Sequence, residues 1–235
     1  MFYLYCLSDE VTARMLEGVP GVGGVAPRLI DYEGIAVVLS EWVEASVPVT
    51  RENVLAHERV VSRVLAETTP LPFRFGAIAG AERIANYVAS QKASLQAALE
   101  RVRGAVEMSV KIIWDAAEQR REDAADAAQS IVAATGAGTK FLLEKRRELA
   151  GDERLKRRAE NLSAWLAEIL RDVVKDSFVK VNPAESLVIS ASHLVGRADV
   201  NAYRGRIDNA SKKQPELRFL TSGPWPPYSF SNLFP

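Results

Sequence analysis

The residues that could carry acid–base, metal or nucleophilic chemistry are few in this chain and far apart. There are two histidines, His57 and His193, and one cysteine, Cys6. Glu58 follows His57, but adjacent positions of a helix diverge, so this pair predicts no catalytic dyad. Two histidines without cysteines or carboxylates at ligand spacing predict no metal site. Cys6 lies within an apolar run, where a thiol is typical of a core residue. We therefore expect no enzyme and no catalytic, cofactor or metal residue.

The glycine cluster at residues 18–24, GVPGVGG, is the one stretch that could cradle a phosphate. No Lys-Ser or Lys-Thr follows it, and the next residues have the pattern of a strand. A helix N-terminus would therefore not face a bound anion. The cluster predicts a plain loop.

Composition narrows the class of protein. The 235 residues carry 30 basic and 30 acidic side chains, for a net charge of +0. Nucleic-acid binding needs a concentrated basic face, so this balance disfavours it.

One cysteine excludes an internal disulfide and suits a reducing cytosol. The first residues, MFYLYCLSDE, lack a basic flank and indicate a buried strand, not a signal peptide. No run approaches the roughly 18 apolar residues of a membrane span. We expect a soluble cytoplasmic protein without membrane insertion.

The first half of the chain predicts a compact α/β unit in the order β-α-β-β-α-β. We expect a strand over 2–7, a helix over 11–16, strands over 28–32 and 35–40, a helix capped by Thr50, and a strand-like run over 71–78. Glu33-Gly34 marks a hairpin between the second and third strands. The order is ferredoxin-like.

The second half is organised around residues 107–114, EMSVKIIW, whose apolar side chains alternate as in a half-buried strand. A connecting helix over 82–103 precedes this strand. Long helices over 115–176, strands over 178–181 and 186–195, a helix over 199–212 and a strand over 217–220 follow it. The plan of the first half is therefore repeated with a helical insertion. We predict an α+β (α/β two-domain) fold, with a ferredoxin-like domain over 1–103 and a second βαββαβ-like domain over 104–235.

The helical insertion contains a coiled-coil-like seam. Its apolar positions follow spacings of 4, 3, 4, 3 and 4 at Leu155, Ala159, Leu162, Leu166, Ile169 and Val173. The seam fits a helical hairpin packed within the chain, and it also fits self-association of two copies. Gly151-Asp152 either breaks the helix or marks a phase slip.

The chain ends in an aromatic, proline-rich tail over 222–235, SGPWPPYSFSNLFP. The prolines favour an extended path without backbone donors. Trp225, Tyr228, Phe230 and Phe234 are too many aromatics for a solvated end. Each is worth roughly 2–3 kcal/mol when buried. The tail therefore either docks on its own chain or meets a partner, and we expect it to dock on its own chain.

Several blocks of the chain together resemble the gas-vesicle accessory family GvpF/GvpL. They are FYLYCL at 2–7, HERVV at 57–61, LPFRFG at 71–76, EMSVKIIW at 107–114, GTKFLLEKR at 138–146 and GPWPPYSF at 223–230. They follow the order of the family and span almost the whole chain. Cys6 stands where the family often has glycine, and Phe141 where it often has tyrosine.

The resemblance implies a non-enzymatic factor in the assembly of gas vesicles, the hollow protein shells that give prokaryotic cells buoyancy. Such a factor is expected to bind the main shell protein as a chaperone, a nucleator or a minor shell component. Other accessory proteins are possible partners, and the expected location is the cytoplasm, at the gas vesicle. The candidate partner-binding residues are Phe73, Phe75, Trp225, Tyr228 and Phe230.

Two other functions are open to a ferredoxin-like protein. An enzyme or small-molecule-binding protein would need a deep polar pocket with perturbed carboxylates. An RNA-binding module would need exposed aromatics in a regular pattern on a sheet, which LPFRFG matches only loosely. The residues favour neither.

Overall fold

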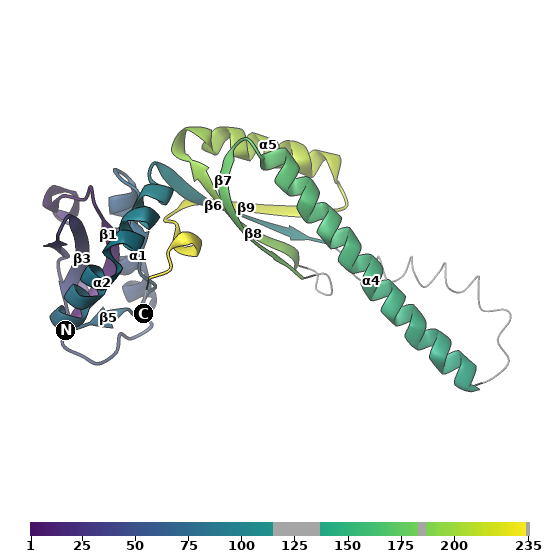
Figure 1. Ribbon diagram of the computed structural model, residues 1–235, viewed down its shortest axis with the longest axis horizontal. Helices are drawn as coiled ribbons and strands as arrows, with labels where there is room; N and C mark the ends of the chain where they lie inside the picture. Colours follow the sequence, from purple (N-terminus) through teal and green to yellow (C-terminus); the bar gives the residue numbers. More distant parts are fainter. Residues whose placement is uncertain (115–136, 183–186, 234–235) are drawn as a thin grey trace. The chain divides into compact units, whose positions relative to one another are not determined.

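The computed structural model describes residues 1–114, 137–182 and 187–233, and these fall into two compact units (Figure 1). Unit 1 contains residues 1–108, 194–197 and the C-terminal segment from Gly223. Unit 2 contains residues 109–193 and 198–222. We expected the C-terminal segment to belong to the second domain. It belongs to unit 1 instead.

Unit 1 is built on an antiparallel sheet with β1 at its centre. Its strands are β1 (Phe2–Ser8), β2 (Arg28–Tyr32), β3 (Ile35–Glu41), β4 (Leu71–Pro72) and β5 (Ile78–Ala79). The order is β2-β3-β1-β4, and β5 also pairs with β1. The expected hairpin is confirmed, because Tyr32 pairs with Ile35 and both Glu33 and Gly34 have positive φ.

Two expected elements of unit 1 are wrong in detail. The helix over 11–16 is a 3-10 turn, η1 (Ala13–Leu16), and a second turn, η2 (Val22–Gly24), follows. Only Leu16 of η1 is buried, too little apolar surface for a longer helix. The strand-like run over 71–78 is two short strands, because the chain turns at Gly76, whose φ is +91°.

Helices cover both faces of the unit 1 sheet. The helix α1 (Arg51–Leu65) begins at Thr50, whose Oγ1 accepts from Asn53 N–H at 3.2 Å, as expected. It packs on one face with η2, against Tyr3, Tyr5 and Cys6. The helix α2 (Ala81–Val102) packs on the other face, against Leu4 and Leu7. Adjacent residues of a regular strand face opposite sides, but Tyr5 and Cys6 face the same side. The reason is that the pairing of β1 with β3 shifts its register between Leu4 and Cys6.

The second sheet is antiparallel, in the order β7-β8-β6-β9. Its strands are β6 (Ala105–Ile113), β7 (Val174–Val181), β8 (Leu187–Gly196) and β9 (Arg218–Trp225). The alternation of EMSVKIIW is confirmed, since Met108, Val110 and Ile112 are fully buried. The strand expected over 217–220 continues to Trp225, so the first residues of the predicted tail belong to β9.

Two helices of unit 2 lie in the described part of the chain, α4 (Ala137–Leu170) and α5 (Val200–Lys213). The backbone of α4 is helical through Gly151-Asp152, so these residues do not break it. Leu155, Ala159, Leu162 and Leu166 of the seam are buried, and α4 contacts α5 and β7 within the same chain. The seam therefore packs within the chain, and its burial leaves little surface for self-association. The helix expected from Asp115 lies outside the described residues, which include no helix long and apolar enough to cross a bilayer.

Candidate functional site at the docked C-terminal segment

All five candidate partner-binding residues lie in unit 1, but they are divided between two clusters and the surface. Phe73 and Phe230 belong to one apolar core and are only 2% and 6% exposed. Phe75 and Tyr228 are half-buried and pack against His57. Trp225, at the end of β9, is 43% exposed. The expected docking of the tail on its own chain is thus confirmed for the segment 226–233.

The buried His57 of α1 is the centre of an aromatic cluster. Its Nδ1 lies 2.6 Å from the hydroxyl of Tyr3 and its Nε2 lies 3.1 Å from the hydroxyl of Tyr228. The ring of Tyr5 stacks on the imidazole at 5.7 Å, and the ring of Phe75 meets it edge-on at 6.0 Å. The imidazole therefore ties the central strand, α1 and the C-terminal segment together.

Hydrogen bonding to Tyr3 indicates the tautomer of His57. The Tyr3 hydroxyl accepts from Gly76 N–H at 3.4 Å, which leaves its own proton for His57 Nδ1. Nε2 then carries the ring proton and faces the Tyr228 hydroxyl. Burial lowers the pKa of His57 to about 4, while a hydrogen bond to the Phe73 carbonyl raises it slightly against that effect. His57 is neutral near pH 7, with both nitrogens occupied by structural contacts.

A buried carboxylate holds the segment after Tyr228. Glu107 of β6 accepts two bonds from Ser229, from the backbone N–H at 2.8 Å and from the hydroxyl at 2.7 Å. The Ser231 hydroxyl donates to the Pro72 carbonyl at 2.7 Å, and the Arg101 guanidinium lies 5.7 Å from the centre of the Phe230 ring. These contacts fix the segment on β4, β6 and α2, so it is a built part of unit 1.

The glycine cluster is a loop, as expected, and Tyr5 explains one of its glycines. The Tyr5 hydroxyl accepts from Val22 N–H at 2.8 Å and lies 2.8 Å from Ser40 Oγ. A Cβ at Gly21 would stand 2.3 Å from that hydroxyl and 2.4 Å from the Val25 carbonyl oxygen. Gly21 is therefore required by a close approach of the loop to the core.

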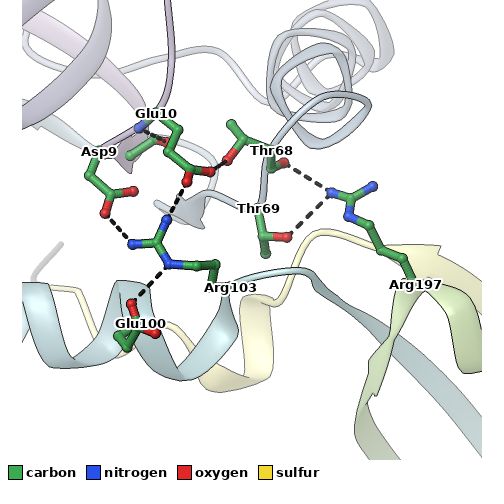
Figure 2. Close-up of polar contacts among 8 residues, drawn as sticks. Asp9, Glu10, Thr68, Thr69, Glu100, Arg103 and Arg197 are labelled. Atoms are coloured by element: carbon green, nitrogen blue, oxygen red, sulfur yellow. Dashed lines mark hydrogen bonds and ion pairs between the residues drawn. The ribbon is translucent and has the colours of Figure 1, made fainter.

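Figure 2 shows a polar network in unit 1 whose members are far apart in the sequence. Arg103, after α2, pairs with Asp9 at 2.6 Å, with Glu100 at 2.9 Å, and with Glu10. Glu10 in turn accepts from the Thr68 hydroxyl at 2.7 Å. These charges raise the pKa of Arg103. The network joins the end of β1 to both helices, and no local pattern could have predicted it.

Arg197 caps the C-terminal end of α1 in the same network. Its Nη2 donates to the Thr68 carbonyl at 3.0 Å and to the Thr69 hydroxyl at 3.3 Å (Figure 2). It also donates to the Leu65 carbonyl. A cation at the last carbonyls of a helix satisfies unpaired acceptors and complements the helix dipole. Arg197 thus positions the end of α1.

The chemistry of this region is structural. The described residues contain no group of three or more His, Cys, Asp or Glu side chains that could hold a metal ion. In unit 2, His193 lies 2.8 Å from the Tyr203 hydroxyl, and burial lowers its pKa to about 4. Both histidines and Cys6 are buried core residues, in agreement with the packing role expected from the sequence.

An exposed apolar groove on unit 1 was not predicted. It measures about 620 Å³ and lies between the glycine loop and α1. Val19, Pro20, Leu55 and Ala66 form its apolar part, and Glu58, Arg59 and Arg63 of α1 also line it. Leu55 is 44% exposed, and Val43, Val49 and Val54 are also exposed. Val54 lies outside the buried stripe of α1, which includes Val60, Val61 and Val64. We call Val49, Val54 and Leu55, together with the groove, the α1 surface.

Comparisons with known proteins cover the full chain. Residues 1–232 match the family model described as "Gas vesicle synthesis protein GvpL/GvpF". Gas vesicle protein L of a Streptomyces species is 28% identical, with 98% of this chain and 92% of that protein covered. Gas vesicle protein F1 of Halobacterium salinarum is 26% identical over 98% of this chain and 92% of that protein.

The fold is also that of a solved structure. The crystal structure of the gas vesicle protein GvpF from Anabaena sp. PCC7120 matches with a TM-score of 0.78 and 20% identity, over 99% of this chain and 96% of that one. The GvpF structure from Microcystis aeruginosa gives the same TM-score at 17% identity, over 99% of each chain. With the family model matched over residues 1–232, the chain belongs to the GvpL/GvpF family of gas vesicle synthesis proteins.

Proposed function

We propose that this protein is a gas vesicle assembly factor that binds the main shell protein, as a chaperone, a nucleator or a minor shell component. The observation that carries the proposal is the family match over residues 1–232. Its expected place is the cytoplasm, at the growing gas vesicle, and other accessory proteins are the further partners that the resemblance implies. The role needs surfaces that recognise protein and no catalytic group.

The physical problem is a shell subunit with an apolar face that must stay dry until it joins the wall. An uncovered apolar patch or strand edge leads to aggregation. A helper protein prevents this by covering the patch with an apolar groove of its own. The α1 surface offers such a groove, with Leu55 at its side and Val49 beyond the start of the helix.

The aromatic residues predicted for this contact then divide by burial. Trp225 is exposed enough to touch a partner, and Phe75 and Tyr228 present part of their rings. Phe73 and Phe230 could contribute only by holding unit 1 together, because their side chains are in the core. We therefore place the shell contact on the α1 surface and give Trp225 a secondary role.

The sheet of unit 1 bears on the ferredoxin-like fold that we propose for the N-terminal domain. The strand order β2-β3-β1-β4 is that of a ferredoxin-like sheet, which supports reading the N-terminal domain as a variant of that fold. The turns η1 and η2 take the place of its first helix. The proposed domain boundary stays near 103/104, at the start of β6.

Binding of purified protein to the main shell protein, with turbidity followed in parallel, tests the function. Wild type should bind and suppress turbidity, whereas Leu55→Asp combined with Val49→Asp should weaken binding at least tenfold. Asn201→Asp combined with Ala202→Asp is the matched control, because it also adds two carboxylates, at exposed positions of α5 in unit 2. Absence of any binding by wild type would refute direct contact with the shell protein. Equal loss in both variants would refute the α1 surface.

A further inference from the structure

The sheet of unit 2 has one face covered by helices. On β8, His193 bonds to Tyr203 of α5. On β9, Phe219 and Thr221 share a cavity with Ile207 of α5. On β7, Val179 shares a cavity with Leu166 of α4. Beyond the end of β6, Trp114 lies under the Arg158 guanidinium of α4, 5.4 Å away. Each strand thus has at least one residue, on it or next to its end, whose contact with α4 or α5 shows which side of the strand faces the helices.

Alternation along each strand assigns the opposite side chains to the other face. We call this the open face, and define it by Lys111 and Ile113 of β6, Phe178 and Lys180 of β7, and Arg218 and Leu220 of β9. All belong to unit 2. Phe178 is 63% exposed, Leu220 is 41% exposed and the three cations are exposed. The strand β8, which lies between β7 and β6, contributes half-buried Ser190 and Ser192 and, near its start, fully buried Val188.

The charge of the open face is one-sided. Among the described residues, Lys111, Lys180 and Arg218 take part in no ion pair, although ion pairs are common elsewhere in the chain. Two acidic residues share this alternation. Asp176 lies toward the start of β7, and Glu107 of β6 belongs to unit 1, where it accepts two bonds from Ser229. Three cations next to exposed Phe178 and Leu220 form an apolar surface with a positive charge.

We propose that the open face binds an acidic segment of a partner protein that also carries apolar side chains. Complementary charge selects and orients the segment, and Phe178, Leu220 and Ile113 supply contact area. Lys180 and Lys111 lie two strands apart, about 10 Å laterally, so one short segment can reach both. The site is on unit 2, so it is separate from the shell contact proposed for the α1 surface.

A protein segment fits this face better than single-stranded RNA does. RNA recognition on a sheet uses two or three exposed aromatics on which bases stack. Here Phe178 is the aromatic side chain of the open face, and the other apolar residues that define the face, Ile113 on β6 and Leu220 on β9, are aliphatic. Serines and aliphatic side chains favour contacts with a polypeptide.

Fluorescence anisotropy on the full chain tests the proposal with three labelled probes. One is a 12-residue peptide of alternating Glu and Leu, one is its Lys and Leu counterpart, and one is a 12-nucleotide oligouridylate. We expect the acidic peptide to bind at least tenfold tighter than the basic peptide, and the affinity to fall as salt rises. Lys111→Glu combined with Arg218→Glu should weaken binding of the acidic peptide at least tenfold.

The controls make each outcome decisive. Lys156→Glu changes an exposed lysine on α4 and should leave the affinity within twofold. Phe178→Ser should weaken binding at high salt, where apolar contact dominates. The proposal is overturned if Lys156→Glu acts as strongly as the double variant, or if acidic and basic peptides bind equally. It is also overturned if the oligouridylate binds more tightly than the acidic peptide. Circular dichroism of each variant shows that loss of binding is not loss of fold.

Discussion

The two sheets of this protein differ in how their faces are used. In unit 1, α1 and α2 cover opposite faces, and β1 between them is almost completely buried. In unit 2, α4 and α5 cover one face, and the strand β7 is mostly exposed. A sheet covered on both faces must be stabilised by packing, whereas an open face can change its residues at little cost in stability. The difference separates residues that hold the fold from residues free to recognise a partner.

Removal of an aromatic side chain should show this contrast most strongly. Phe73→Ala leaves a cavity in the core of unit 1, so we expect it to lower the free energy of unfolding by about 3–5 kcal/mol. Phe178→Ala, on the open face, should change it by less than about 0.5 kcal/mol. Chemical denaturation of both variants gives the values. Similar losses would mean that the open face is packed in the intact protein.

Each unit has one buried histidine, so acidification should destabilise both. Burial lowers the pKa of His57 and of His193 to about 4, below the value near 6.5 of an unfolded chain. Between these values the unfolded state binds more protons, so stability falls as the pH falls from 6.5 toward 4. The full loss is about 3 kcal/mol for each histidine.

Unfolding by urea at a series of pH values measures that loss. His57→Phe and His193→Phe should each make the dependence on pH less steep, even though each variant is less stable near pH 7. A slope between pH 4 and 6.5 that neither substitution changes would show that other groups control acid stability.

The docked segment should contribute an intermediate amount. Ser229→Ala removes one of the two hydrogen bonds that Ser229 donates to buried Glu107, so we expect a loss of about 1–3 kcal/mol in the free energy of unfolding. Ser90→Ala is the control, because the Ser90 hydroxyl is exposed and donates to the carbonyl of Tyr87, three residues away in the same helix. Increased proteolysis of the C-terminal segment in Ser229→Ala would show where the structure opens. An unchanged stability would mean that Glu107 is satisfied in another way.

The exposed ion pairs should have the smallest effect. Arg103→Gln removes three pairs in unit 1, but these groups are solvated and screened by salt. We expect a smaller shift of the urea midpoint than for Ser229→Ala, and a still smaller one in 1 M salt. A shift that does not depend on salt would assign Arg103 a packing role instead.

Local patterns in the sequence predicted much of the fold. The strands at 28–32 and 35–40, the hairpin between them and the helix after Thr50 follow from alternation, turn residues and capping. The start of β7 at Val174 was missed because an open face allows polar residues at alternate positions. The shift of register within β1 was also missed, since it depends on the partner strand.

The candidate site was predicted less well, because burial is a property of the folded chain. Aromatic density marked Phe73 and Phe230, but it could not show that both lie in the core. The contact between His57 and Tyr228 joins residues 171 positions apart, beyond any periodic pattern. Leu55 and Val54 of the α1 surface carry the same kinds of side chain as a buried stripe, so only the structure shows that they are exposed.

Hydrogen–deuterium exchange of the full chain, with and without the main shell protein, tests the central claim most directly. We predict that backbone amides of α1 and of residues 42–50 exchange more slowly when the shell protein is bound, and that exchange over β7 does not change. Protection confined to unit 2, or no protection at saturating shell protein, would contradict binding through the α1 surface.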